Sequence, residues 1–434
     1  MRIAFYTLGC KVNQYETQAL EQLVTRRGHT LAPFEGEADA YVINTCTVTA
    51  VSDKKSRQVI RRARKQAPDS IIAVCGCYPQ THREDVERLG VDLVAGTGDR
   101  TGFVELLERE WQQRQPITAL DDAFQRRVFE SLPAGGLEGR TRAMLKVEDG
   151  CVNFCSYCII PYARGRVRSL PIPDCVAQAQ ALVEAGYREI VVTGIEISSW
   201  GQDLEREESL IDLVEALCRG VPPQVRVRLG SLEPRTITPD FCRRAAALPN
   251  LCPHFHLSMQ SGCDTVLQRM NRKYDTRRYL ESVTLLRQVY EAPAVTTDLI
   301  VGFPGETEEE FDQTLDFIRR CAFSAMHVFP YSKRPGTPAA SMAGQVPNRV
   351  KEERAHRAAQ AAREMEEAYL DQWVGREEEV LFEEQREGLW RGHTARYCPV
   401  AMPAETDLHN RLCLVKITGR KGDTLMAEPV DNAR

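Results

Sequence analysis

Short apolar strands alternate with amphipathic helical stretches over most of the chain, and this alternation constrains the fold more than any other feature. From Met1 to about Arg114 the strands read RIAFYTLG, AYVINT, IIAVCG and DLVAGTG, with helical stretches beginning near Asn13, Ser52 and Thr81. Such alternation predicts a parallel sheet with crossover helices. We therefore expect an open parallel α/β domain over residues 1–115.

A polar stretch containing Gly and Pro follows and indicates a linker over residues 116–140. The alternation then resumes, with strands at RAMLKVED, EIVVTGIE, VRVRLGS, HFHLSMQS, TTDLIVGF and MHVFPYS. Six strand-helix units predict a partial (β/α)6 barrel over residues 141–345. A charged helix should connect it, over residues 346–374, to a small C-terminal β-barrel over residues 375–434.

Composition narrows the class of protein and its expected location in the cell. Of the 434 residues, 43% are hydrophobic and 27% charged, and no apolar run reaches the roughly 18 residues of a membrane span. The N-terminus lacks the pattern of a signal peptide, so we expect a cytoplasmic protein with no membrane contact. In that compartment the fifteen cysteines should be metal ligands or buried thiols rather than disulfides. Because the net charge is −5, any RNA-binding surface must be local.

Three cysteines stand close together at the start of the second alternating region. Cys151, Cys155 and Cys158 have C-x-x-x-C-x-x-C spacing in a loop after the first strand of the predicted barrel. Three thiolates can hold a [4Fe–4S] cluster and leave one iron open for a substrate. The alternative is a structural zinc site, which needs a fourth ligand that the nearby sequence does not offer.

The chain resembles the radical S-adenosylmethionine (SAM) methylthiotransferases. The resemblance rests on ordered segments that include LGCKVNQYET, NTCTVT, GCYPQ, VEDGCVNFCSYCIIPYARGRVRS, TGIEISSWG, DLIVGFPGET and FPYSKRPGTPA. KVNQYET most resembles the bacterial branch that acts on N6-threonylcarbamoyladenosine at position 37 of tRNA. The position of the C-terminal barrel matches the RNA-binding TRAM domain of that family.

The resemblance implies two [4Fe–4S] clusters, one of them on Cys151, Cys155 and Cys158. The second would lie on Cys10, Cys46 and Cys77, each of which follows a predicted strand. Cys75 is the alternative third ligand, but it lies within an apolar strand. One SAM would methylate sulfur at this second cluster, and another would give the 5′-deoxyadenosyl radical that allows a methylthio group to replace C2–H of adenine. The implied partners are the tRNA anticodon loop, an electron donor and a sulfur source.

Other residues are candidates for binding SAM or RNA. Thr193, Gly194 and Glu196 follow a barrel strand, where such folds collect their active sites, and Gly302 lies in IVGFPGE, where the backbone must come close to a neighbour or a ligand. His256 and Gln260 share one face of a strand and would line a pocket or the core. Arg57, Arg61 and Arg64 share a helix face that could contact RNA phosphates or only solvent. Beside the barrel cysteines, YARGRVRS adds Arg164, Arg166 and Arg168 to the basic residues.

Three other functions remain open from the sequence. Sister enzymes with the same apparatus would modify N6-isopentenyladenosine of tRNA or an aspartate of a ribosomal protein. A non-catalytic iron-sulfur protein that binds RNA or carries electrons is the alternative from another class, and it would be expected to supply four ligands to each cluster.

Overall fold

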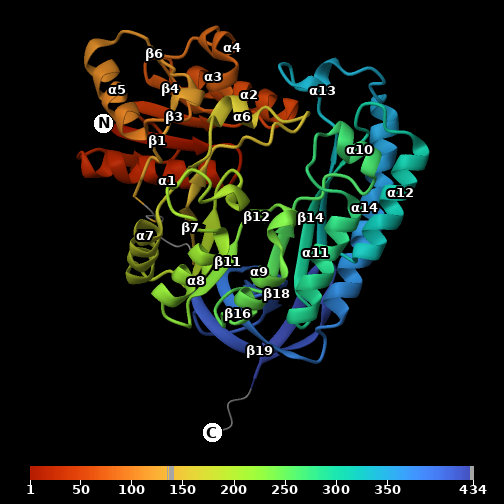
Figure 1. Cartoon of the computed structure of the whole chain (residues 1–434). Helices are drawn as coiled ribbons and strands as arrows, with labels where there is room; N and C mark the ends of the chain where they lie inside the picture. Colours follow the sequence, from red (N-terminus) through yellow and green to blue (C-terminus); the bar gives the residue numbers. More distant parts are fainter. Residues whose placement is uncertain (134, 136–140, 431–434) are drawn as a thin grey trace.

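The computed structural model describes residues 1–133, 135 and 141–430. Figure 1 shows an N-terminal α/β domain above a partial barrel, with a small β-barrel at the opposite end. No helix in the described ranges is long and apolar enough to cross a membrane.

The N-terminal domain contains a six-stranded parallel sheet with the order β2-β1-β3-β4-β5-β6. Its strands are β1 Arg2–Thr7, β2 Thr30–Ala32, β3 Ala40–Thr45, β4 Ile71–Gly76, β5 Leu93–Ala95 and β6 Ile117–Ala119. Every residue of β3 and β4 is buried, because helices cover both faces of the sheet, as parallel sheets require.

Five helices cover this sheet: α1 Lys11–Arg26, α2 Ala50–Gln66, α3 Cys77–Thr81, α4 Arg83–Glu87 and α5 Arg100–Gln113. Helices α1 and α5 pack on one face through Leu20 and Phe103, while α2 and α4 cover the other through Ile60 and Val86. Helix α2 begins where the side chain of Thr49 accepts a hydrogen bond from the backbone N–H of Ser52, a favourable N-cap.

Strand β6 lies within the stretch that the sequence suggested as a linker. It pairs with β5 over Leu93–Ala95, so the sheet continues to Ala119 instead of ending near residue 115. The proline and polar residues around this strand obscured its short apolar pattern. The remaining part of the stretch includes a 3-10 turn, η1 Ala123–Gln125, and residues 134 and 136–140 lie outside the described part.

The expected incomplete barrel is confirmed. Its parallel strands form two hydrogen-bonded groups, β11-β10-β7 and β12-β13-β14-β15. They are β7 Arg142–Lys146, β10 Glu189–Thr193, β11 Arg226–Leu229, β12 Ser231–Leu232, β13 His254–Leu257, β14 Ala294–Val301 and β15 Ala325–Pro330. A short antiparallel pair, β8 Glu148–Asp149 and β9 Arg168–Ser169, follows β7. Strands β11 and β12 are consecutive in the chain and lie where the two groups meet, so β7 and β15 are the edges of the open barrel.

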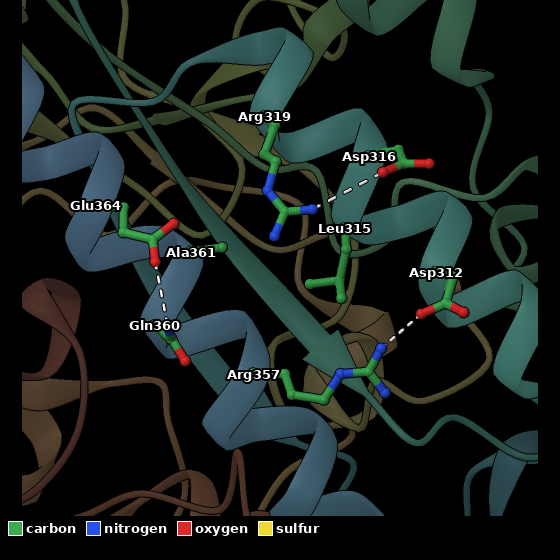
Figure 2. Close-up of a pocket in the computed structure, with 8 residues that line it drawn as sticks. All are labelled: Asp312, Leu315, Asp316, Arg319, Arg357, Gln360, Ala361 and Glu364. Carbon is green, nitrogen blue, oxygen red and sulfur yellow. Dashed lines mark hydrogen bonds and ion pairs between the residues drawn. The ribbon is translucent and has the colours of Figure 1, made fainter.

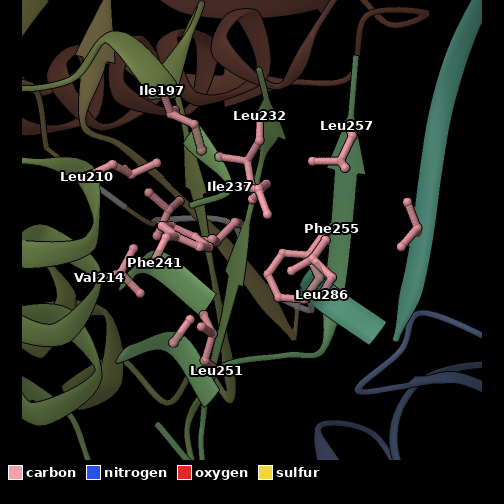
Figure 3. Packing of buried hydrophobic residues seen from close by; sticks show 14 of the residues in the cluster. Ile197, Leu210, Val214, Leu232, Ile237, Phe241, Leu251, Phe255, Leu257 and Leu286 are labelled. Carbon is pink, nitrogen blue, oxygen red and sulfur yellow. The ribbon is translucent and has the colours of Figure 1, made fainter. Parts of the chain in front are cut away.

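Helices surround the outer face of these strands. They are α7 Ile172–Glu184, α8 Leu210–Gly220, α9 Pro239–Ala246, α11 Thr276–Val289 and α12 Glu308–Cys321. Shorter elements lie in the segments that follow the carboxyl ends of the strands: α6 Ile160–Arg164, α10 Asp264–Arg269, α13 Pro338–Ser341 and the 3-10 turns η2 Ile197–Ser199 and η3 Pro234–Thr236. The core between strands and helices is apolar, and Figure 3 shows Phe241, Phe255 and Leu286 within it. Alternate strand residues are therefore directed either outward into this core or inward into the barrel.

The long charged helix α14 Asn348–Asp371 leads to a closed barrel of order β16-β17-β18-β20-β19. Its strands are β16 Glu377–Arg386, β17 Leu389–Thr394, β18 Pro399–Met402, β19 Arg411–Lys421 and β20 Thr424–Pro429. This barrel contacts the lower end of the partial barrel, where Arg228 donates to the carbonyl oxygens of Ala395 and Thr394.

Candidate metal centres at a domain interface

Three cysteines of the N-terminal domain gather at the carboxyl end of its sheet. Cys10, Cys46 and Cys77 follow β1, β3 and β4, and we call them the auxiliary triad. Burial raises the pKa of Cys46, and the nearby Cys10 thiol adds to the rise. Burial raises the pKa of Cys77 to about 12; Arg164 opposes this rise, whereas Cys46 and Cys10 increase it. Thiols of this kind stay protonated until a metal displaces the proton.

The loops that carry the auxiliary triad fit closely together. Gly9 has a φ of +116°, and a Cβ there would lie 2.8 Å from the Cβ of Cys46. The side-chain amide of Asn13 donates to the carbonyl oxygens of Leu8 and Thr45, both at 2.9 Å. Asn13 therefore joins the loop before Cys10 to the loop before Cys46.

Cys75 and Cys77 have different surroundings although they are two residues apart. Cys75 is fully buried within β4, in the apolar layer that contains Phe103 and Leu107 of α5. Cys77 begins α3, beyond the end of the strand. The electrostatic neighbours of Cys77 include Cys10 and Cys46, whereas those of Cys75 are Arg100, Glu16 and Arg164. These positions favour Cys77 as the third member of the triad.

The second group, Cys151, Cys155 and Cys158, lies in the loop between β8 and α6, and we call it the radical triad. Burial raises the pKa of Cys158 to about 12, and Cys155 adds to the rise. Arg272 donates a hydrogen bond of 3.1 Å to the sulfur of Cys155. A backbone hydrogen bond of 2.9 Å from Cys158 to Cys155 and one of 3.0 Å from Cys151 to Gly165 fix the loop.

No three His, Cys, Asp or Glu side chains within the described ranges are arranged to hold a single metal ion. A four-iron cluster places a different requirement on its ligands, because each thiolate binds a separate iron. Two sets of three thiols, each able to bind three of the four irons, have the donor chemistry that such clusters would need.

Six charged side chains form a buried network between the N-terminal domain and the partial barrel. Its members, each at most 5% exposed, are Glu16, Arg100, Lys146, Asp149, Arg164 and Arg168. Glu16 is the centre: it accepts hydrogen bonds of 2.7 Å from Arg100 and 3.2 Å from Lys146, and it pairs with Arg164. Asp149 pairs with Lys146 at 2.7 Å and with Arg168 at 3.4 Å.

Cations outnumber carboxylates in this network by four to two. Half-buried Glu130, which accepts from the backbone N–H of Arg100, can add only one more negative charge. Buried charge is costly unless it is compensated. The Nε of Arg164 is also buried without a hydrogen-bond partner, and Cys77 lies in the field of this guanidinium. An anionic cluster on the auxiliary triad would fit this excess of positive charge.

The residues expected to bind SAM at the carboxyl end of β10 are Thr193, Gly194 and Glu196, and each has different neighbours. Thr193 ends β10, and its carbonyl oxygen accepts from Val147 at 2.9 Å. A Cβ on Gly194 would lie 2.7 Å from an oxygen of Glu148, and the same oxygen accepts from the backbone N–H of Glu196 at 2.7 Å. Burial, followed by the charge of Glu233, raises the pKa of Glu196 to about 7.

Gly302 has a φ of +70°, and a Cβ there would lie 2.4 Å from the side chain of Lys351 on α14. Its backbone N–H donates to Glu306 at 2.6 Å. The close approach at Gly302 is therefore to α14 and to its own loop.

The basic face of α2 differs from the expected solvent-exposed ridge. Arg64 is half-buried and donates to the carbonyl oxygens of Gly90, Pro68 and Ser70, and Arg57 donates to the hydroxyl of Tyr78 at 2.8 Å. Arg61 is exposed and has no hydrogen bond or ion pair within the described part of the chain. Spacing predicts a shared helix face, but it does not reveal which guanidinium reaches the next loop.

Two of the arginines in YARGRVRS also differ from expectation. Arg164 and Arg168 are buried in the charged network, and Arg166 is exposed. Sequence reasoning missed Asn13 and Glu16 as well, because a polar residue early in a helix is usually solvated. Their position directly after Cys10 was the available signal.

A hollow of about 440 Å³ lies between α12 and α14, on the outer side of the barrel (Figure 2). Arg357 pairs with Asp312 at 2.6 Å and Gln360 donates to Glu364 at 3.1 Å along its walls. These groups satisfy one another, and neither cysteine triad borders the hollow.

Comparison with known proteins agrees with this arrangement. Residues 145–318 match the Radical SAM superfamily, and residues 2–96 match the Uncharacterized protein family UPF0004. A threonylcarbamoyladenosine tRNA methylthiotransferase of Bacillus subtilis (strain 168) is 43% identical over 96% of this chain and 93% of its own. The chain belongs to the radical SAM methylthiotransferase family. This methylthiotransferase is thus an enzyme of a superfamily that uses a [4Fe–4S] cluster and SAM.

Two further relatives place the methylthiotransferase within its family. A threonylcarbamoyladenosine tRNA methylthiotransferase of Aquifex aeolicus is 36% identical over 82% of this chain and 86% of its own. A tRNA-2-methylthio-N(6)-dimethylallyladenosine synthase of Symbiobacterium thermophilum is 33% identical over 99% and 95%. Among solved structures, the radical SAM methyltransferase TsrM of Kitasatospora setae matches with a TM-score of 0.57 and 15% identity over 78% of this chain and 75% of its own, which supports the fold alone.

Proposed function

We propose that this enzyme replaces C2–H of N6-threonylcarbamoyladenosine in the tRNA anticodon loop by a methylthio group. The observation that carries the proposal is the 43% identity, over 96% of the chain, to a relative named for this activity. Two thiol triads joined by one buried network support it, because the reaction needs both a radical source and a site for sulfur. We infer a cytoplasmic location from the tRNA substrate.

The radical triad is the proposed site of the first [4Fe–4S] cluster, with SAM at its open iron. SAM bound there would supply a 5′-deoxyadenosyl radical. The backbone around Thr193 and Gly194 lies at the carboxyl end of β10, where it can orient the methionine part of SAM. Arg272 contributes a positive charge beside Cys155, and Tyr157, half-buried next to it, limits the access of water.

The auxiliary triad is the proposed site of the second cluster and of the sulfur that is transferred. Asn13 holds the two loops that carry Cys10 and Cys46, and Arg164 supplies positive charge from the partial barrel. An electron donor must reduce the first cluster, and a sulfur source must replenish the second. Exposed Arg61 on α2 is the proposed RNA contact of that helix.

The second candidate substrate is N6-isopentenyladenosine of tRNA. The 33% identity, over 99% of the chain, to the dimethylallyladenosine enzyme supports this candidate. It ranks second because the identity to the threonylcarbamoyladenosine relatives is higher. Nucleoside mass spectrometry of tRNA from a deletion strain separates the two. We expect loss of the methylthio derivative of threonylcarbamoyladenosine and its return with the wild-type gene but not with a Cys151→Ala gene. Loss of the isopentenyl derivative instead would overturn the assignment.

A further inference from the structure

Three polar side chains lie side by side on the inner face of the open barrel. His256, Asp298 and His327 come from the adjacent strands β13, β14 and β15, and Asp298 is directly opposite His327 in the register. Their neighbours in sequence, such as Leu257 and Leu299, are buried in the core under the outer helices. Because side chains alternate along a strand, the three polar groups face the interior of the barrel.

These three side chains form a row of contacts that runs from His256 through Asp298 to His327. Asp298 lies 3.4 Å from His256 and 3.2 Å from Nδ1 of His327. The exposed fraction of the side chain rises along this row, from 15% for His256 to 31% for Asp298 and 72% for His327. The hydrogen bond with Asp298 raises the pKa of His327. Within the described ranges Nε2 of His327 takes part in no hydrogen bond or ion pair, so it remains available to a ligand.

A lysine of the N-terminal domain lies within electrostatic range of His327. Lys11 begins α1, next to Cys10, and it lies in the electrostatic field of Arg142 and Arg228. Arg142 and Arg228 are paired with Glu383 and Glu189. Lys11 has neither a hydrogen bond nor an ion pair in the described part of the chain, so its amino group is available to a ligand.

An apolar side chain adjoins His327. Phe329 follows two residues after His327 on β15, so it shares the inner face. Its ring is 46% exposed and lies 6.3 Å from the ring of His327. Since β15 is an edge strand of the open barrel, a ligand can reach this surface from the side. The surface therefore combines an apolar wall with two nitrogen donors, His327 and Lys11.

We propose that His327 and Lys11 bind the carboxylate of the amino-acid arm of the modified adenosine, with Phe329 beside the apolar part of the arm. The proposal rests on the proposed function and adds the subsite that recognises this substrate. An isopentenyl arm has no charge and gains nothing from the two donors. The subsite would therefore distinguish the two substrates of the related enzymes by charge rather than by size.

The test compares the binding of two anticodon stem-loop RNAs to the anaerobically prepared holoenzyme without SAM. One RNA carries threonylcarbamoyladenosine, and in the other a carboxamide replaces the carboxylate of the arm. We expect the wild type to bind the carboxylate RNA about tenfold more tightly, the size of one hydrogen bond between charged groups. His327→Phe should bring this ratio close to one, and it should leave the affinity for the RNA with unmodified adenosine unchanged.

His356→Phe is the matched control, because His356 is an exposed histidine on α14 and should keep the wild-type ratio. Lys11→Met provides a second variant and should also reduce the ratio. A wild type with no preference for the carboxylate, or a His327→Phe protein with the full preference, would overturn the subsite. Mass spectrometry of tRNA treated with the same wild-type preparation tests the proposed function separately, since methylthio transfer can succeed where the subsite fails.

Discussion

Arg164 donates a hydrogen bond of 3.0 Å to the side-chain oxygen of Asn13 and so connects the loops of the two cysteine triads. Arg164 lies six residues after Cys158, and Asn13 lies three residues after Cys10. The same oxygen of Asn13 lies 3.6 Å from the sulfur of Cys10. A contact between side chains therefore links the two triads directly, in addition to the contacts that the linker makes through Glu130.

Replacing Arg164 should weaken the interface between the two domains. Arg164→Met removes one of the three cations around buried Glu16, and loss of one partner of a buried ion pair costs about 3 kcal/mol or more. We expect the thermal denaturation midpoint to fall by about 5 °C or more. Arg166→Met is the control, because Arg166 is exposed two residues away. Equal midpoints for the two variants would contradict the role of the network.

The radical triad should be required for SAM cleavage and for only one cluster. The wild type should bind about eight irons if both clusters are of the four-iron type. The Ala variant of Cys151, Cys155 and Cys158 should retain about four and produce no 5′-deoxyadenosine. Iron and sulfide analysis together with chromatography of the nucleoside product measure both outcomes. Full iron content in this variant would rule out the proposed ligands.

Cys77 and Cys75 form a matched pair for the auxiliary triad. Cys77→Ala should abolish methylthio transfer and lower the iron content, while SAM cleavage remains measurable because the radical triad is intact. Cys75→Ala removes a sulfur from the apolar layer under α1 and α5 and should cost only about 1 kcal/mol of stability. Assays of both variants for tRNA modification and iron decide between the two cysteines, and the reverse result would exchange their roles.

Arg61 and Arg64 should have opposite phenotypes although they lie on one helix. Arg61→Gln should weaken tRNA binding and reduce the slope of log affinity against log salt by about 0.7 to 0.9, the effect of one phosphate contact. Arg64→Gln should leave this slope unchanged and lower stability, because three carbonyl oxygens lose their donor. Binding titrations at several salt concentrations and thermal melting test the pair. A salt slope that changes only in Arg64→Gln would reverse the assignment.

The order of the elements could be predicted because each strand carries its own periodic signal. The strand ends at Cys10, Cys46 and Cys77 predicted their convergence, since parallel strands share one carboxyl edge. The network around Glu16 could not be predicted in the same way, because its members come from α1, α5, β7, β8, α6 and β9 and only the packing of two domains brings them together. Strand β6 was missed because three residues beside a proline carry too little periodicity to identify a strand.

The C-terminal barrel also covers the lower end of the partial barrel. Tyr397 lies with its ring 4.9 Å from the guanidinium groups of both Arg142 and Arg228, and it stacks on His393 at 4.5 Å. A chain cut after α14 would therefore lose the closure of this end as well as the small barrel itself. We expect water to reach the inner face that carries His256 and Asp298 from this end, and a site that is open to water protects a reactive intermediate less well.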